Sequence, residues 1–413
     1  MDRIFLKNSL CLYLLSFTKL IVPFLTLPYL TRVLSVDCYG TIAYVKSLMG
    51  YVQLIIDFGF LLSVTKAITE LKKANDWYRI STIVITTTFT RIFLGTVSLF
   101  IICMLTAVIP ILKNNLLYVI LIFISVFITI FWMDFLFRGI EQMKILSFRF
   151  FVSKIIATIL IFCLIKSDED LVLMGVIEIL GSLIAAGCSM IEIVKLKLQF
   201  IIPSFKQCLH ILFDSLSYFM SNFSTTAFTL MVTFLAGLYL DSSNVAFWSL
   251  ALQIVVGIQS FYTPILDALY PAMIREFRFA LIKKVLNIVM PVIIIGCVFI
   301  YFFGGDIIKV IAGERYLVSA HILNYLIPLL IISFPAMLFG WPVLGALGMI
   351  KEVTWTLIVS SLLQIFLLII LIKIDKFNFY YIAVCRCLVE MFLLFSRVTC
   401  FYMNKRLNTN NLL

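Results

Sequence analysis

Long runs of apolar residues alternate with short polar breaks along the whole chain of 413 residues. A helix needs roughly 20 apolar residues to cross the hydrocarbon core of a bilayer. Runs of that length predict an all-α polytopic membrane protein with about twelve membrane-spanning helices. We expect these helices at residues 9–31, 41–67, 80–103, 115–135, 146–165, 171–194, 211–238, 245–272, 282–303, 320–345, 354–373 and 378–402.

A polar loop near the middle of the chain divides the predicted helices into two sets of six. We therefore expect an N-terminal lobe at 1–195, a cytoplasmic loop at 196–210 and a C-terminal lobe at 211–413. Because each set is even in number, the lobes enter the membrane in the same orientation, as in transporters built from parallel repeats. Most basic residues, Arg149 among them, then fall in cytoplasmic loops and tails, which predicts that both termini are cytoplasmic.

The composition excludes an ordinary soluble domain, since 63% of the residues are hydrophobic and 13% are charged. The net charge of +11 is explained by the loop lysines and arginines, so it does not indicate nucleic-acid binding. His210 and His321 lie far apart in the sequence, which leaves little material for a metal centre or a catalytic centre. The sequence therefore predicts neither a metal site nor an enzyme.

Polar residues recur at helical spacing inside several apolar runs, and lipid would not tolerate them on an outward face. Steps of three and four place each set along one side of its helix. The sets are Ser16, Lys19, Pro23 and Thr26; Lys46, Gly50, Gln53 and Asp57; two neighbouring rows at 211–238, with Ser221 and Thr225 in one and Asn222 in the other; and Gln253, Gly257, Ser260, Pro264 and Asp267. Such faces suit water or a polar ligand, although Ser and Thr also commonly bridge packed membrane helices.

Basic residues occur within apolar runs of the first half at Lys19, Lys46, Arg91 and Lys154. An isolated cation at the centre of a bilayer costs about 3 kcal/mol or more. Either a carboxylate partner or an anionic substrate must offset this cost. For Lys19 and Arg91 we expect a substrate-binding cavity, whereas Lys46 and Lys154 fit cavity lining and ion pairing equally well.

Carboxylates within the predicted helices allow two interpretations. Asp57, Glu178 and Asp267 are candidates for carrying a coupling proton or sodium ion, and they could equally neutralise neighbouring lysines. Arg386 and Glu390 lie one helical turn apart, which predicts an ion pair between them.

Four short motifs occur in order along the chain. They are Pro23 and Pro28-Tyr29-Leu30-Thr31-Arg32-Val33-Leu34 with Tyr39-Gly40; Asp57-Phe58-Gly59-Phe60; Arg138-Gly139-Ile140-Glu141; and Leu269-Tyr270-Pro271. Together they resemble the motifs of the O-antigen flippases (Wzx type) of the polysaccharide transport family, within the multidrug, oligosaccharidyl-lipid and polysaccharide exporter superfamily. The likeness covers nearly the whole chain, with Ser35 departing from the glycine that is usual there.

The resemblance implies a two-lobed flippase of the bacterial inner membrane that works by alternating access coupled to an ion gradient. Its implied cargo is a polyprenyl-pyrophosphate oligosaccharide, the O-antigen repeat unit. Lys19, Arg32, Lys46 and Arg91 would then meet the pyrophosphate, while polar rows such as that on the seventh helix would bind sugar hydroxyls. An O-antigen polymerase and a chain-length regulator are implied as protein partners, and no cofactor is implied beyond the coupling ion.

Three other functions fit a chain of this kind. A cation-coupled multidrug antiporter and a peptidoglycan-precursor flippase belong to the same superfamily, although basic stripes suit a cationic drug poorly. An O-antigen polymerase is a different class, and it is expected to carry a large external loop with catalytic arginines or histidines. The longest predicted external segment, at 304–319, contains Lys309 and Arg315 but no histidine.

Overall fold

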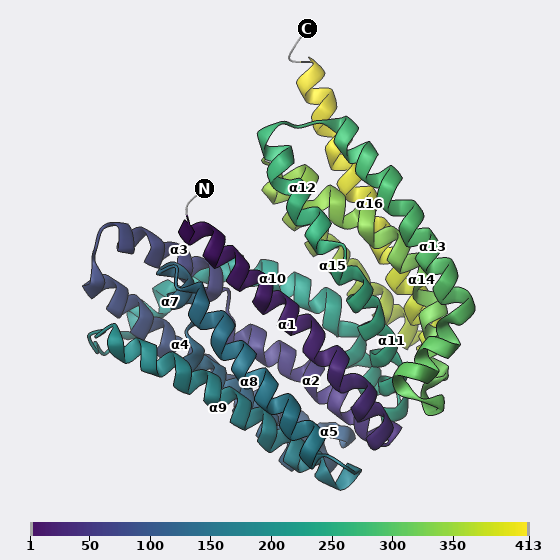
Figure 1. The fold of residues 1–413 in the computed structure, drawn as a ribbon, viewed down its shortest axis with the longest axis horizontal. Coiled ribbons are helices and arrows are strands. Elements are labelled where there is room, and N and C mark those ends of the chain that lie inside the picture. The colour runs from purple at the N-terminus through teal and green to yellow at the C-terminus, as the bar shows by residue number, and fades with distance from the viewer. Residues whose placement is uncertain (1–2, 411–413) are drawn as a thin grey trace. The chain divides into compact units, whose positions relative to one another are not determined.

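The computed structural model describes residues 3–410, with the side chains of residues 3–14, 19–20, 227–228 and 404–410 outside the description. The described residues form helices and short turns, and no strand occurs among them (Figure 1). The predicted all-α class is therefore confirmed. The chain divides into two compact units, Met1–Thr226 and Ala227–Leu413.

Unit 1 contains the six helical regions predicted for the first half and the beginning of the seventh. Five of its described helical segments, some of them built from successive helices, are long and apolar enough to cross a bilayer. The helices of unit 1 are α1 (Arg3–Val33), α2 (Val36–Asp57), α3 (Phe60–Lys73), α4 (Trp77–Val108), α5 (Pro110–Asn114), α6 (Leu116–Ile128), η1 (Thr129–Trp132), α7 (Asp134–Gly139), α8 (Met143–Leu164), η2 (Asp168–Asp170), α9 (Leu171–Lys195) and the first part of α10 (Phe205–Tyr239).

Unit 2 takes up the rest of α10 and the helices that follow. They are α11 (Ser242–Ser260), α12 (Thr263–Arg275), α13 (Phe279–Ala312), η3 (Glu314–Tyr316), α14 (Val318–Leu338), η4 (Phe339–Gly345), α15 (Ile350–Lys373) and α16 (Phe379–Asn410). Within this unit α14 is the central helix, because it packs against α11, α13 and α16.

The boundary between the units falls within α10, later than the predicted loop at 196–210, because the first part of α10 packs on unit 1. The Phe58 and Phe219 rings stack with their centroids 4.3 Å apart. The Ser63 and Ser215 hydroxyls share a hydrogen bond of 2.6 Å. This packing attaches the beginning of α10 to the junction of α2 and α3.

The second predicted membrane-spanning range, 41–67, lies within one membrane-length segment that is built from two helices meeting at this junction. Phe58 and Gly59 both adopt left-handed backbone conformations, with φ of 37° and 77°, so α2 ends and α3 begins there. A side chain at Gly59 would meet the Phe219 backbone nitrogen at 2.7 Å. Glycine is therefore required both for the turn and for the approach of α10.

Three other predicted membrane-spanning ranges are also built from more than one helix. The range 115–135 passes through η1 and the left-handed Met133, and 245–272 breaks between α11 and α12. The range 320–345 breaks at Gly340, whose ψ of −119° is not helical. Hydrophobic runs report length and burial, so they do not reveal where tertiary packing interrupts the backbone.

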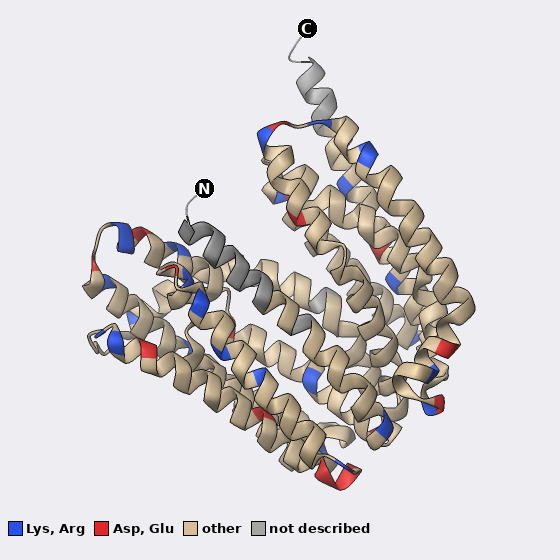
Figure 2. Ribbon diagram, in the orientation of Figure 1, with Lys and Arg blue, Asp and Glu red and all other residues tan. Residues whose placement is uncertain are grey.

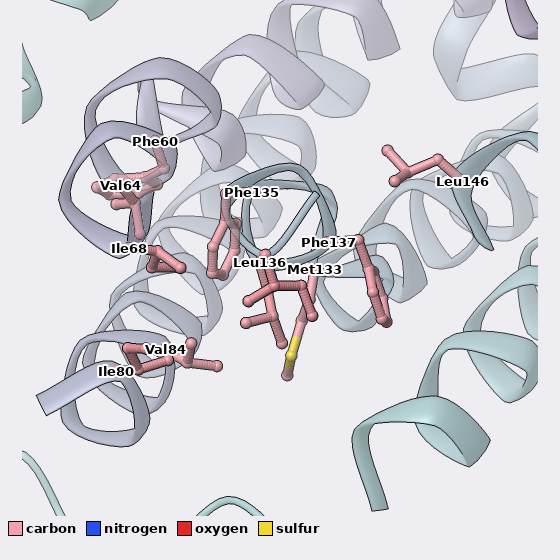
Figure 3. Close-up of a cluster of buried hydrophobic side chains, with 11 residues drawn as sticks. Phe60, Val64, Ile68, Ile80, Val84, Met133, Phe135, Leu136, Phe137 and Leu146 are labelled. Carbon is pink, nitrogen blue, oxygen red and sulfur yellow. The ribbon is translucent and has the colours of Figure 1, made fainter. Parts of the chain in front are cut away.

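The buried cluster at the α3–α7 contact explains why the short helix α7 folds back into unit 1 (Figure 3). Ile68 of α3 packs beside Phe135 and Leu136, and all three side chains are buried. A side chain at Gly139 would lie 2.5 Å from Ile68, so α7 approaches α3 as closely as glycine allows. The full cluster is Phe60, Val64, Ile68, Ile80, Val84, Met133, Phe135, Leu136, Phe137, Ile140 and Leu146.

Ten helical segments among the described residues are long and apolar enough to span a membrane, or eleven if α10 counts as one bent span. The helix α1 covers the remaining predicted range. Figure 2 shows that uncharged residues form most of the ribbon and that many charges lie near helix ends. The protein is therefore an integral membrane protein.

Candidate functional site

The polar face of α2 is the open side of an otherwise enclosed helix. Lys46 is exposed, while nearly every residue from Cys38 to Met49 around it is buried. Gly50, Gln53 and Asp57 continue the same face and are partly exposed. Since lipid disfavours charged side chains, an open face of this composition suits water or a polar ligand.

Two lysines on different helices share one carboxylate beside this face. The Lys46 Nζ of α2 lies 3.5 Å from the Glu178 Oε1 of α9. The Lys154 Nζ of α8 lies 3.3 Å from the Glu178 Oε2. We call these three residues the lysine cluster. Two ammonium groups and one carboxylate leave the cluster with a net positive charge, which is the charge that attracts an anionic ligand.

Hydrogen bonds fix the backbone of α9 near Glu178. The Ser125 hydroxyl of α6 donates to the Glu178 carbonyl oxygen at 3.1 Å and shares a 2.8 Å hydrogen bond with Ser182. The Trp132 indole donates to the Ser182 carbonyl oxygen at 3.2 Å. These contacts attach α9 to α6 and η1, so the carboxylate is presented from a fixed backbone.

Arg91 of α4 lies in a different environment. It belongs to a buried network that includes Gln53 and Asp57, at the C-terminal end of the polar face of α2. Its Nη2 lies 2.6 Å from the Asp57 Oδ1, and its Nη1 donates to the Ile130 carbonyl oxygen at 3.1 Å. The Gln53 amide donates to the Asp57 Oδ2 at 2.9 Å and accepts from the Thr129 hydroxyl at 3.1 Å. We call Arg91, Asp57, Gln53 and Thr129 the arginine network.

In the arginine network the Arg91 guanidinium contacts protein groups, Asp57 and the Ile130 carbonyl oxygen, and is not open to solvent or to a ligand. The Arg91 side chain is 6% exposed, whereas Asp57 is 41% exposed. The guanidinium therefore reaches its carboxylate from within the protein. This geometry favours a structural role for Arg91, and the predicted substrate contact gains no support from it.

Sequence reasoning missed a second buried arginine in unit 1. Arg149 was expected in a cytoplasmic loop, but it lies in α8 with its side chain 2% exposed. It forms an ion pair with Asp134, and it donates to the Ser189 hydroxyl and to the Trp132 carbonyl oxygen. Its partners come from α7, η1 and α9, so no spacing along the sequence could have indicated them.

The remaining predicted site residues of unit 1 lie at varied positions. Arg32 is exposed at the end of α1, and the side chain of Lys19 lies outside the described residues. On α10, Ser221 and Asn222 are half-buried and Thr225 is exposed. The Thr225 hydroxyl donates to the Ser221 carbonyl oxygen at 3.2 Å, as is common for threonine in membrane helices.

Unit 2 holds the other predicted residues. Gln253 is half-buried on α11, and Asp267 is exposed on α12 with no ion-pair partner among the described residues. The predicted pair on α16 is confirmed, since the Arg386 Nη2 lies 3.5 Å from the Glu390 Oε2. Arg386 also donates to the Gln364 amide oxygen at 3.1 Å, which joins α16 to α15.

The sequence matches the polysaccharide biosynthesis protein family over residues 5–277. The chain belongs to this family. The chain is also similar to two curated proteins named "Putative O-antigen transporter", so the predicted resemblance is confirmed. A Shigella dysenteriae protein named "Putative O-antigen transporter" is 26% identical over 342 residues, which cover 81% of this chain and 85% of that protein.

Solved structures of the same fold agree with this family. The lipid II flippase MurJ in its inward closed conformation has a TM-score of 0.68 at 15% identity, over 96% of this chain and 87% of MurJ. A multidrug resistance MATE family transporter of the MOP superfamily, inward-facing, has a TM-score of 0.66 at 14% identity, over 93% and 97%. This member of the polysaccharide biosynthesis protein family therefore has the same fold as these two solved transporters.

Proposed function

We propose that this transporter is a flippase that moves a polyprenyl-pyrophosphate-linked oligosaccharide, the O-antigen repeat unit, from the cytoplasmic to the periplasmic leaflet of the bacterial inner membrane. The lysine cluster is the observation that carries the proposal. It combines two ammonium groups with one carboxylate near the middle of α2 and α8. A positive site inside membrane helices requires an anion to balance it.

Pyrophosphate is the part of such a cargo that this site would bind. Lysine binds phosphate as a point charge, and hydrogen bonds between charged groups are roughly twice as strong as neutral ones. A cationic drug would be repelled by the same ammonium groups, which argues against multidrug antiport. The name of the Shigella dysenteriae relative supports the same class of cargo.

The rest of the predicted site would serve the sugars and the coupling. Ser221, Asn222 and Thr225 on α10, with Gln253 on α11, offer hydrogen-bonding groups for sugar hydroxyls. Asp267 is the coupling candidate without an ion-pair partner among the described residues, so it is the one best placed to take up a proton or a sodium ion. Arg32 and Lys19 stay predicted pyrophosphate contacts.

Alternating access completes the proposal, with both termini in the cytoplasm. The interruptions of α2–α3 at Gly59 and of α14–η4 at Gly340 provide points where helices could bend. An O-antigen polymerase and a chain-length regulator are the protein partners that we propose with this function. A peptidoglycan-precursor flippase is the second candidate, because MurJ shares the fold and lipid II carries the same diphosphate chemistry.

Transfer in liposomes tests the proposal. Purified protein would be reconstituted with labelled polyprenyl-pyrophosphate oligosaccharide, and the fraction that reaches the opposite leaflet would be measured with and without an ion gradient. Transfer well above that of protein-free liposomes is expected. Equal transfer of lipid II would favour the peptidoglycan precursor instead, while export of cationic dyes without any lipid transfer would contradict the flippase.

A matched pair of variants connects that activity to the site. Lys46→Ala with Lys154→Ala should lower transfer about a hundredfold, because two charge-assisted contacts of roughly 1.5 kcal/mol or more each are lost. The control removes two lysines outside the cluster, Lys73 and Lys195, which lie at helix ends. Transfer that falls equally in both double variants would contradict the assigned site.

A further inference from the structure

Glu178 lies between the two lysines in a position that an incoming anion would also prefer. Each carboxylate oxygen faces one ammonium group, with Oε1 toward Lys46 at 3.5 Å and Oε2 toward Lys154 at 3.3 Å. The Glu178 side chain is 20% exposed, against 48% for Lys46 and 32% for Lys154. The ammonium groups are thus more open than the carboxylate that bridges them.

These ion pairs are loose compared with the pair in the arginine network. Strong pairs between ammonium or guanidinium and carboxylate groups have distances of about 2.7–2.9 Å. Arg91 and Asp57 reach 2.6 Å, whereas both lysines stay beyond 3 Å from Glu178. Long, partly exposed pairs contribute little to stability, so the lysines can exchange their partner at small cost.

We propose that Glu178 is an internal competitor for the anionic group of the cargo. This inference rests on the proposed function. Glu178 occupies both ammonium groups while the site is empty, and a diphosphate displaces it, with Lys46 and Lys154 each moving to one phosphoryl group. When the cargo leaves, the carboxylate returns to the lysines.

The competition gives the site a way to release its cargo. A transport site must bind strongly enough to load and weakly enough to unload. Because the Ser125 hydroxyl and the Trp132 indole donate to carbonyl oxygens of α9, the Glu178 carboxylate stays close to the lysines and competes at a high effective concentration. Glu178 is in this account a residue that sets affinity and release, and it does not contact the cargo itself.

Equilibrium binding to Glu178→Gln tests the inference in the full-length purified protein. The probes are polyprenyl diphosphate, polyprenyl monophosphate and inorganic pyrophosphate. Without the competing carboxylate, polyprenyl diphosphate should bind roughly tenfold more tightly, the combined size of two partly exposed ion pairs. Monophosphate, which can engage the two lysines less fully, should gain less. Glu192→Gln, which changes a partly exposed carboxylate on the same helix outside the lysine cluster, is the matched control and should leave every affinity unchanged.

The pyrophosphate probe separates the headgroup from the lipid. A gain for both diphosphates supports competition at the headgroup, and a gain for polyprenyl diphosphate alone supports competition that also requires the lipid chain. Unchanged or weaker binding of both diphosphates by a folded Glu178→Gln protein would overturn the inference.

Should that variant not fold, Glu178→Asp keeps the charge but reaches less far, and it should bind diphosphate more tightly than the native protein. Weaker binding by Glu178→Asp would overturn the inference as well.

Failure of the proposed function has a different signature. Absence of lipid transfer by the native protein in liposomes would reject the flippase. Even then, comparing how tightly the native protein and Glu178→Gln bind inorganic pyrophosphate would decide whether Glu178 competes at the two lysines.

Discussion

The lysine cluster and the arginine network both include residues of the same face of α2, yet they are built differently. In the arginine network a buried guanidinium meets Asp57 at 2.6 Å and also donates to a backbone carbonyl. In the lysine cluster two partly exposed ammonium groups share Glu178 at 3.5 Å and 3.3 Å. The difference teaches that a cation within a membrane helix can be part of the fold or part of a binding site, according to how fully protein groups satisfy it.

The largest effect should come from removing the carboxylate of the arginine network. Asp57→Ala leaves the buried Arg91 guanidinium without its charged partner, which should cost about 3 kcal/mol of stability. Thermal unfolding of the purified protein in detergent measures this loss. Glu192→Ala, which removes a carboxylate paired with the exposed Lys195, is the control and should change the melting temperature little. If Asp57→Ala left the thermal stability unchanged, the ion pair of Arg91 with Asp57 would contribute nothing to the fold, and the comparison of the two sites would fail.

A smaller effect, on activity instead of stability, should follow from a single change in the lysine cluster. Lys46→Ala should lower lipid transfer about tenfold while changing stability by less than about 1 kcal/mol, because the lysine is partly exposed. Transfer in liposomes and thermal unfolding, measured on the same preparation, separate the two quantities. Lys46→Arg keeps the charge and should retain most of the transfer. A loss of stability in Lys46→Ala as large as that in Asp57→Ala would contradict the distinction between a binding site and a structural site.

The smallest effect should come from the neutral part of the arginine network. Gln53→Leu removes the hydrogen bonds to Asp57 and from Thr129 but leaves the ion pair in place, so it should cost about 1 kcal/mol. Thermal unfolding beside Asp57→Ala gives the ratio of the two losses. A loss from Gln53→Leu equal to that from Asp57→Ala would show that the ion pair adds nothing to the hydrogen bonds.

Hydrophobic pattern predicted the helical regions of the fold, while the breaks depended on tertiary packing. The helix at each predicted range follows from apolar length alone. The turn at Phe58 and Gly59 does not, because it requires the approach of α10 and places a phenylalanine in a conformation that favours glycine. Local sequence contains one side of that contact only.

For the candidate site, helical periodicity predicted which residues share one face of a helix, but it did not predict their partners on other helices. Steps of four, three and four placed Lys46, Gly50, Gln53 and Asp57 on one face of α2. The pair of Arg386 with Glu390 followed from their separation by one helical turn. The partners of Arg91 and Lys154 come from other helices. Which cation is buried and which is open is decided by packing between helices, so a single sequence does not reveal it.

Headgroup selectivity tests the central claim most directly. Liposomes with the native protein, and with the Lys46→Ala and Lys154→Ala double variant, would be given the same oligosaccharide on polyprenyl diphosphate or on polyprenyl monophosphate, and the ratio of the two transfer rates would be measured. The account predicts that the native protein prefers the diphosphate and that the double variant loses this preference. An undiminished preference in a folded double variant would contradict the assignment of the lysine cluster to the cargo.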